Sequence, residues 1–542
     1  MPNTYNIYKI KHHKVKELKD KLKSVGLVEQ KTLPTLKYSK TFYFSENIKG
    51  NDVWWWKTYR EFFNDNVKEP KNTFNFGVLL CQNLENEEQI YAVSLGKSHF
   101  YLSKFIHLDF GIDLAIRVAD ENSILLKKSR YFTGTKRQDV SSYQRFQIGS
   151  YEAGESVDHL KLKAANKEIW GERNIIFADS IQMDMDKQPF ELSAIFQQID
   201  ESFRGEKIIH LPKLESVGTE AASELDKLLL EHLKNADGQV LIEEFQVHGI
   251  AICFSFHDYD YEIKAKVDRG NHRKALGNTI DIQSISDFLG DHPDITDINN
   301  VTVQFKSEDT GRFTRTLKEI LDCPIEYEEQ QYFLKNGEWF VFNQTFMNYL
   351  KRSLDSIEIK LEEPLVESAF IAWQTEKRKN AKPDDDKIDY REAYFNQKIC
   401  NERGFQLLDR VLMNIKSLEQ KRRSYQVEVA DIYNNGEIIS VKISKKKPEL
   451  IYNIEQSRDA ITLIKNKTIK FDSELHSAAL WFVFEDDVEK ITDVNSIQFL
   501  LAVESWHKLV KNHGLTPRIY ISKHERGVKK KDRKKRKAQQ KP

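Results

Sequence analysis

The alternation of apolar and polar residues is clearest in the last third of the chain. It has the two-residue period of half-buried strands along SYQVEVADI (424–432) and EIISVKIS (437–444). Asn435-Gly436, a pair typical of tight hairpin turns, lies between the two runs. The pattern therefore predicts a β-hairpin, with Asp431 near the end of its first strand and Lys442 in the middle of its second.

Helical and strand patterns alternate on both sides of this hairpin. A helical pattern over 390–403 ends at Gly404, in the place of a C-terminal glycine cap, and a strand pattern follows over 405–412. After the hairpin, the pattern predicts a helix at 448–466, a strand at 479–484, a helix at 496–514 and a strand at 518–522. The predicted order of this region is α-β-β-β-α-β-α-β.

The whole chain predicts an α+β or α/β multidomain protein, because 542 residues exceed what one hydrophobic core usually organises. In the first part, 112–121 and 124–132 alternate in the manner of strands. A charged, proline-containing segment at 377–389 is the best candidate for a linker. We predict an N-terminal α+β domain at 1–190, a middle α+β domain at 191–375, a C-terminal domain at 376–525 and a disordered basic tail at 526–542.

Two runs in the first half of the chain contain residues that could serve a function. The aromatic run WWWKTYREFFNDN (54–66) predicts a helix, and packing of its rings against a sheet is favoured over stacking on bases. HDYDYEIK (257–264) offers ligands for a metal, but on a strand its acids and Lys264 share one face opposite the apolar one. A solvent-facing strand is therefore the favoured interpretation of the second run.

Composition narrows the range of protein classes. No apolar run is long enough to cross a bilayer, and the charged N-terminus lacks the apolar segment of a signal peptide. The four cysteines are far apart, without the spacing of a zinc site or a disulfide framework, so we expect a cytoplasmic protein without a membrane partner. The sequence contains no P-loop and no GxSxG or HExxH motif.

A neutral total charge conceals a basic C-terminus. Eleven Lys and Arg residues against two acids occur in Lys523–Pro542, so the rest of the chain is acidic. A segment with so few apolar groups is expected to be disordered and to lie on nucleic-acid phosphates, unless it serves solubility or contacts the acidic body. The candidate nucleic-acid contacts are Lys529, Lys530, Lys531, Arg533, Lys534, Lys535, Arg536 and Lys537.

The C-terminal order α-β-β-β-α-β, with an acid and an amine on neighbouring strands, resembles the restriction-endonuclease-like fold of PD-(D/E)xK nucleases, and its Mrr-type branch in particular. The resemblance implies that Asp431 binds metal and that Lys442 meets the charge of the phosphate or orients the attacking water. It also implies that Glu392, twelve residues before Gly404, completes the metal shell, and that Gln456 supports the site. The implied cofactor is Mg²⁺, held by Asp431 and Glu392.

One position departs from the nuclease pattern. Ser440 occupies the place two before the lysine where an active nuclease usually has Glu, Asp or Gln. A hydroxyl is a weaker ligand than a carboxylate, so Glu392 or Glu428 would have to compensate. Glu428 lies three residues before Asp431, which on an unbroken strand places it on the other face, so a β-bulge would be needed.

The chain also resembles, from about residue 5 to 525, a family of roughly 550-residue bacterial proteins called sporadically distributed proteins. The matching segments, in order, are AVSLGKSHFYL, FGIDLAIRVADENSILLKKS, NGEWFVFNQTFMNYL, REAYFNQ, LLDR, VEVADI and ISVKI. The family has no settled activity, and its patchy occurrence implies a role in defence against phage or plasmids. Family members tend to have His in the place of Ser440, which favours a binding pair or an altered active site at Asp431 and Lys442.

Two functions from different classes follow from these observations. The first is a nucleic-acid-binding bacterial defence-type protein that acts as a Mg²⁺-dependent endonuclease on phage or plasmid DNA. The second is a non-catalytic nucleic-acid-binding or scaffold protein with a degenerate nuclease fold. An RNA-targeting toxin and a homo-oligomer are compatible with the residues, although DNA is favoured over RNA as the partner.

Overall fold

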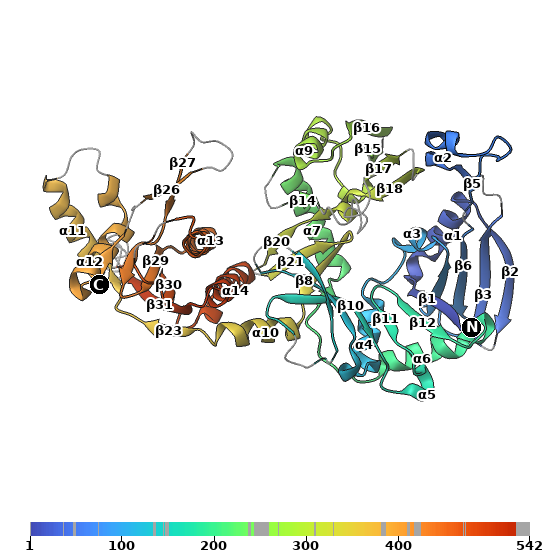
Figure 1. Cartoon of the computed structure of the whole chain (residues 1–542), viewed down its shortest axis with the longest axis horizontal. Helices are drawn as coiled ribbons and strands as arrows, with labels where there is room; N and C mark the ends of the chain where they lie inside the picture. The colour runs from blue at the N-terminus through green and yellow to red at the C-terminus, as the bar shows by residue number, and fades with distance from the viewer. Residues whose placement is uncertain are drawn as a thin grey trace, which may run out of the picture.

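The computed structural model has a mixed α+β architecture with several separate sheets, which confirms the predicted α+β class (Figure 1). It describes residues 2–526 except 36, 47–49, 74, 134–136, 145, 147–150, 237–239, 243–258, 269, 308–310, 329, 381–385, 409–411, 417–423, 470 and 472. The candidate nucleic-acid contacts of the tail, and His257 and Asp258, lie outside these described residues. Within them, no helix is both long enough and apolar enough to cross a bilayer.

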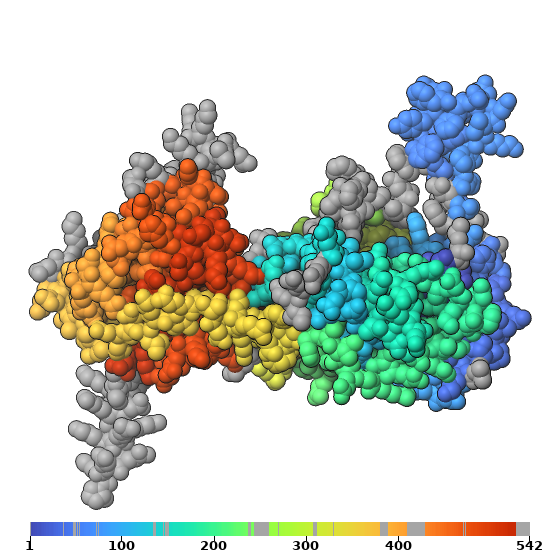
Figure 2. All heavy atoms as spheres, turned by 60° about the horizontal axis from the view of Figure 1, so that its bottom comes forward, coloured from blue at the N-terminus to red at the C-terminus, as the bar shows by residue number. Residues whose placement is uncertain are grey.

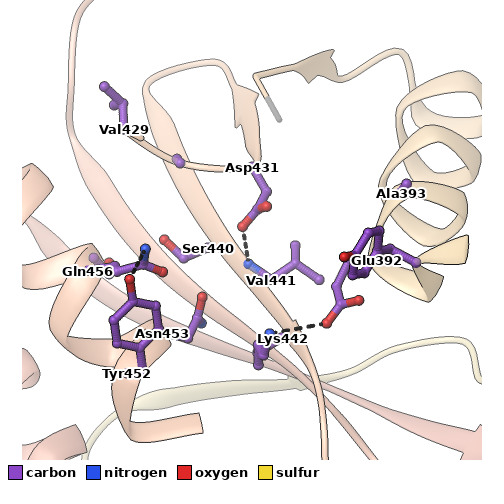
Figure 3. A pocket seen from close by; sticks show the side chains of 13 residues that line it. Glu392, Ala393, Val429, Asp431, Ser440, Val441, Lys442, Tyr452, Asn453 and Gln456 are labelled. Carbon is purple, nitrogen blue, oxygen red and sulfur yellow. Dashed lines mark hydrogen bonds and ion pairs between the residues drawn. The ribbon is translucent and has the colours of Figure 1, made fainter. Parts of the chain in front are cut away.

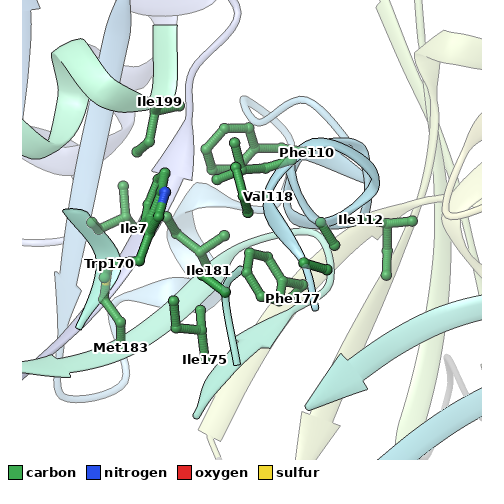
Figure 4. Close-up of a cluster of buried hydrophobic side chains, with 14 of the residues drawn as sticks. Ile7, Phe110, Ile112, Val118, Trp170, Ile175, Phe177, Ile181, Met183 and Ile199 are labelled. Atoms are coloured by element: carbon green, nitrogen blue, oxygen red, sulfur yellow. The ribbon is translucent and has the colours of Figure 1, made fainter. Parts of the chain in front are cut away.

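The N-terminal part is built on one ten-stranded sheet in which every neighbouring pair of strands is antiparallel. Its strands, in sheet order, are β2 (Leu27–Thr35), β3 (Tyr38–Ser45), β6 (Gly77–Asn83), β7 (Ile90–Leu95), β1 (Asn3–Lys9), β12 (Ile181–Met185), β11 (Ile175–Phe177), β10 (Glu155–Leu162), β8 (Leu126–Tyr131) and β9 (Arg137–Ser142). The helices α4 (Phe110–Val118) and α6 (Leu192–Arg204) pack on this sheet and share its hydrophobic core (Figure 4).

The strand predicted at 112–121 is wrong, because this segment forms helix α4. Seven of its nine residues are buried, so the helix lacks the polar stripe by which the 3.6-residue period is usually recognised. Gly111 allows the close approach of this helix to the turn between β11 and β12. A Cβ atom at Gly111 would lie 2.3 Å from the carbonyl oxygen of Ser180 and 2.6 Å from that of Ala178.

The aromatic run forms a shorter helix than predicted. This helix, α2 (Trp54–Thr58), has only five residues and lies on an arm that projects from the body (Figure 2). Trp56 is buried, and the centroids of the Trp56 and Phe63 rings are 4.0 Å apart, whereas Tyr59 is 52% and Phe62 is 83% exposed. Packing of the rings against a sheet stays a prediction.

The middle part contains two four-stranded antiparallel sheets. In sheet order they are β13 (Leu214–Ser216), β22 (Glu338–Phe342), β21 (Gln330–Lys335) and β20 (Pro324–Tyr327), and β16 (Gly270–Gly277), β15 (Asp260–Val267), β17 (Val301–Ser307) and β18 (Gly311–Thr316). Alternate residues of β15 are buried, and Glu262 on its other face is paired with Lys306 at 2.6 Å and with Lys264 at 3.4 Å. Glu262 and Lys264 of the acidic run thus form ion pairs within the sheet.

A buried ion-pair cluster joins the middle part to the N-terminal sheet. The Lys335 ammonium, on β21, lies 3.0 Å from a carboxylate oxygen of Asp158 on β10 and 3.3 Å from one of Asp109 at the start of α4. All three side chains are at least 88% buried, so each charge depends on its partners for stabilisation.

The C-terminal part is organised by a mixed sheet (Figure 1). In sheet order its strands are β23 (Glu358–Leu361), β31 (Thr516–Glu525), β30 (Ser477–Phe484), β29 (Glu437–Ile443), β28 (Ile432–Asn434) and β25 (Gln406–Leu407). The pairs from β23 to β29 are parallel, whereas β28 is antiparallel to both β29 and β25. The strand direction therefore changes between β28 and β29.

Helices cover both faces of this sheet. One face packs on α11 (Glu367–Asn380) and α12 (Arg391–Arg403), and the other on α13 (Lys447–Lys465) and α14 (Ile497–Asn512). All eight residues of β30 are buried, as is typical of a strand in a parallel sheet covered on both sides. The helices and strands predicted after the hairpin are confirmed, and Gly404 ends α12 with a left-handed φ of 68° as predicted.

The first strand of the predicted hairpin is not continuous. β27 (Ser424–Glu428) pairs with β26 (Leu412–Lys416) in a separate two-stranded sheet, whereas β28 joins the main sheet. Residues 429–431 between them lie in neither strand. The prediction of one unbroken strand over 424–432 is therefore wrong, and the break occurs at the candidate metal ligand Asp431.

The close approach at Gly111 gives a testable stability difference. Gly111→Ala should lower the free energy of unfolding by about 1–3 kcal/mol, because the new methyl group would overlap main-chain atoms that cannot move aside. Gly290→Ala in α9 (Ile282–Asp291) is the matched control, since its Cβ meets nothing within 4 Å and alanine favours a helix. Urea denaturation followed by circular dichroism measures both; equal stability of the two variants would contradict the packing described for α4.

Candidate functional site

A polar cavity of about 210 Å³ lies between α12 and α13, beside the carboxyl end of β29 (Figure 3). All four site residues predicted from the sequence line it, although they come from α12, the segment before β28, β29 and α13. The described lining residues are Tyr390, Glu392, Ala393, Val429, Ala430, Asp431, Ser440, Val441, Lys442, Tyr452, Asn453, Gln456 and Ser457. The structure therefore brings Asp431, Lys442, Glu392 and Gln456 to one place.

The break before β28 creates the space for this cavity. Strand pairing between β28 and β29 ends at Ile432, opposite Ile439, so the last four residues of β29 have no β28 partner. Beyond this point the main-chain N–H of Val441 donates to the Asp431 carboxylate instead of to a strand, with a distance of 2.7 Å to Oδ2. The main chain of Asp431 is held as well, since its N–H donates to the Ile439 carbonyl at 3.0 Å.

A second hydrogen bond, from helix α12, orients the Asp431 carboxylate. Asn396 on α12 is fully buried, and its Nδ2 donates to Asp431 Oδ1 over 3.4 Å. The Asn396 Oδ1 atom has no hydrogen-bond partner among the described residues. The two hydrogen bonds hold both carboxylate oxygens of Asp431 at the cavity.

Lys442 and Glu392 form an ion pair across the cavity. The Lys442 Nζ lies 3.3 Å from Glu392 Oε1, and the two side chains are 27% and 26% exposed (Figure 3). Ser440 is two residues before Lys442 on the same strand, so both side chains leave the same face of β29. The side chains of Lys442 and Glu392 are thus mostly shielded from water, but they can be reached from the cavity.

Helix α13 contributes a polar wall that the sequence indicated only in part. Gln456 lines the cavity as predicted, and its Nε2 donates to the Tyr452 hydroxyl over 3.2 Å. Asn453, three residues earlier on the same helical face, was not predicted. It is 6% exposed, and its Nδ2 has no acceptor within the described part of the chain. A buried donor without an acceptor on a cavity wall is suited to bind an oxygen atom of a ligand.

The donor atoms around the cavity fit a hard divalent cation. Asp431, Glu392 and Ser440 supply oxygen donors, and no thiol or imidazole is among the described lining residues. Oxygen ligands are those that Mg²⁺ prefers. The side chain of Glu428, the other acid considered, is not among those that the structure describes.

Ion pairs behind the cavity fix the start of α12, where Glu392 is located. Arg391 binds Glu367 of α11 through two hydrogen bonds of 2.9 and 2.6 Å. The ring of His524 on β31 lies 2.7 Å from the same carboxylate. The hydrogen bond from Arg391 is the main cause that lowers the pKa of Glu367 to about 2. Burial raises this pKa, and the hydrogen bond with His524 lowers it further. Glu367 is thus a positioning residue for the helix that carries Glu392.

Comparison with known proteins gives a family but no activity. The model of one family, described as "Family of unknown function (DUF6119)", matches residues 5–504. This match agrees with the predicted resemblance of nearly the whole chain to a family without a settled activity. No curated protein and no solved structure matches the chain.

The shifted pKa of Glu367 predicts a pH-dependent contribution to stability. Its carboxylate ionises near pH 2 in the folded protein, against an ordinary value of 4.5, so it stabilises the fold fully above pH 4.5. That contribution should decline as the pH falls from 4.5 towards 2. Glu367→Gln should therefore lower the melting temperature at pH 7, and its difference from the wild type should shrink below pH 4.5.

Glu363→Gln is the control for this experiment. Glu363 is 71% exposed and lies 3.9 Å from Lys398, so its loss should change stability by less than about 1 kcal/mol at any pH. Melting curves by differential scanning fluorimetry between pH 3 and pH 7 give the comparison. A Glu367→Gln difference that stays constant over this range would contradict the assigned ion pairs.

Proposed function

Because the chain belongs to the DUF6119 family, whose function is unknown, we propose its function from the cavity itself: a Mg²⁺-dependent nuclease site that cleaves phosphodiester bonds. In this proposal the C-terminal sheet is a restriction-endonuclease-like core of the Mrr type. The protein would act as a nucleic-acid-binding bacterial defence protein on phage or plasmid DNA.

The observation that carries this proposal is the convergence of Asp431, Glu392 and Lys442 on one cavity. The arrangement of the sheet also supports it. Antiparallel β25, β28 and β29 are followed by α13, which crosses over to the parallel strand β30. An acid before β28 and an amine on β29 are consistent with the predicted nuclease pattern.

Each side chain of the cavity has a chemical role that follows from its position. Asp431 and Glu392 would hold the cation, which supplies a Lewis acid for the phosphate and lowers the pKa of bound water. Lys442 would leave Glu392 and place its ammonium against the negative charge that grows on the phosphate. Asn453 would donate its buried Nδ2 to a non-bridging phosphate oxygen, and Gln456 would hold Tyr452 at the rim.

Binding of DNA rather than a small phosphate ester rests on the sequence of the tail. The nine Lys and Arg residues between Lys529 and Lys541 would neutralise several phosphates without recognising a sequence. The acidic remainder of the chain would by itself repel a polyanion, so the tail would supply the attraction.

A second candidate function is non-catalytic binding of nucleic acid on the same cavity. Two observations favour it: Ser440 stands where a third acid is usual, and the Lys442 amine is engaged by Glu392. Both oxygens of Asp431 also accept hydrogen bonds that maintain the fold. In this case the cavity would bind a phosphate without activating water.

Nicking of supercoiled plasmid distinguishes the two functions. We expect the wild type to nick plasmid with Mg²⁺ or Mn²⁺ and to lose activity in EDTA. Lys442→Ala should reduce the rate roughly a hundredfold or more, because it removes a charge aimed at the transition state. Lys445→Ala, which removes an exposed lysine from the same segment, should retain the wild-type rate.

Equal nicking by the wild type and by Lys442→Ala would refute the catalytic assignment. Plasmid binding by the wild type without nicking, in either metal, would establish the non-catalytic function instead.

A further inference from the structure

A second cluster of ligand-type side chains lies in the middle part, away from the C-terminal cavity. His272 is on β16, the edge strand of its sheet, and His292 and Asp294 follow the end of helix α9 (Figure 1). One ligand atom from each of the three residues can be chosen so that all lie within 4.8 Å of one another. A search of the described residues for three or more potential ligands within this distance gives this group.

The contacts within this His-His-Asp cluster are close. The Nε2 atom of His272 lies 2.7 Å from Oδ2 of Asp294. The rings of His272 and His292 are stacked, with centroids 4.0 Å apart and planes inclined by 13°. In a tetrahedral zinc site with bonds of about 2.0–2.2 Å, neighbouring donor atoms are about 3.4 Å apart. The three donor atoms are already near this spacing, and the imidazole rings would turn out of their stack so that a nitrogen of each points at one ion.

The segment that carries two of the three ligands is held in place by the surrounding structure. The ring of Phe288 on α9 packs edge-on against His292, with centroids 5.0 Å apart. Ile295 is buried, its N–H donates to the His292 carbonyl, and its own carbonyl accepts from Lys234 at 3.0 Å. Ligands that neighbouring residues already hold in place lose little conformational entropy when they bind a metal.

We propose that His272, His292 and Asp294 form a binding site for a divalent cation of the zinc type. Two nitrogen donors and one carboxylate match zinc better than Mg²⁺, which prefers oxygen ligands. His272 is 28% and Asp294 51% exposed at the side chain, so water would complete the coordination.

The ion would join β16 to the segment after α9. An edge strand presents unpaired main-chain groups to other chains, and β16 is exposed along alternate positions. A metal that ties this strand to the helix would stabilise the sheet at its open edge. The site is therefore structural, and it is separate from the proposed nuclease cavity.

Titration calorimetry of the full chain with ZnCl₂ tests this proposal. We expect one Zn²⁺ per chain for the wild type, with affinity reduced about tenfold or more in His292→Ala and in Asp294→Asn. Asp294→Asn keeps the shape of the side chain, so it tests the ligand even if His292→Ala folds poorly. His476→Ala is the control, because His476 forms an exposed pair with Glu474 at 3.3 Å but belongs to no cluster of three ligands within the described residues.

The cobalt spectrum gives an independent readout. Co²⁺ in place of zinc should produce visible absorption bands of a low-coordinate site in the wild type and in His476→Ala, but not in Asp294→Asn. Failure of the wild type to bind Zn²⁺, or undiminished binding by both cluster variants, would overturn the proposal. Either result would leave the nuclease proposal unaffected, because Asp431 and Glu392 are not part of this site.

Discussion

The C-terminal cavity depends on one hydrogen bond, in which the carboxylate of Asp431 replaces a strand as partner of the Val441 N–H. A continuous strand beside β29 would pair with its carboxyl end and fill the space. The chain instead leaves the main sheet at 429–431, and β27 pairs elsewhere with β26. The end of β29 that has no β28 partner thus forms a wall of the polar cavity. The same acid maintains the fold and lines the cavity, so its structural role and its proposed role will be difficult to separate by mutation.

Two helices complete this wall from opposite faces of the sheet. Helix α12 brings Glu392 to Lys442, and its first turn is fixed by the ion pairs of Glu367. Helix α13 brings Asn453 with its buried donor. The side chains of Lys442 and Glu392 are about a quarter exposed, so the pair can be reached from the cavity. Under the proposed function, a phosphate would replace Glu392 as partner of Lys442, and a cation would replace Lys442 as partner of Glu392.

The placement of Asp431 and Lys442 on one cavity could be predicted, because the two residues are close in sequence and a turn pair lies between them. Glu392 was predicted from the resemblance to Mrr-type nucleases, and it lines the same cavity. The break before β28 could not be predicted, because the main sheet decides where strand pairing stops. Helix α4 was missed because burial on nearly all sides removes its polar stripe. Asn453 was missed because its importance lies in an unsatisfied atom, which only the packed structure reveals.

An anomalous difference map from a Mn²⁺-soaked crystal of the full chain would locate a cation bound in this cavity. We expect a peak within about 2.0–2.6 Å of carboxylate oxygens from both Asp431 and Glu392, with Lys442 released from Glu392. We also expect Asp431 Oδ2 to accept still from the Val441 N–H. A map without a peak in this cavity at saturating Mn²⁺, while the cavity is open to solvent, would contradict the claim that these residues form a metal-dependent site.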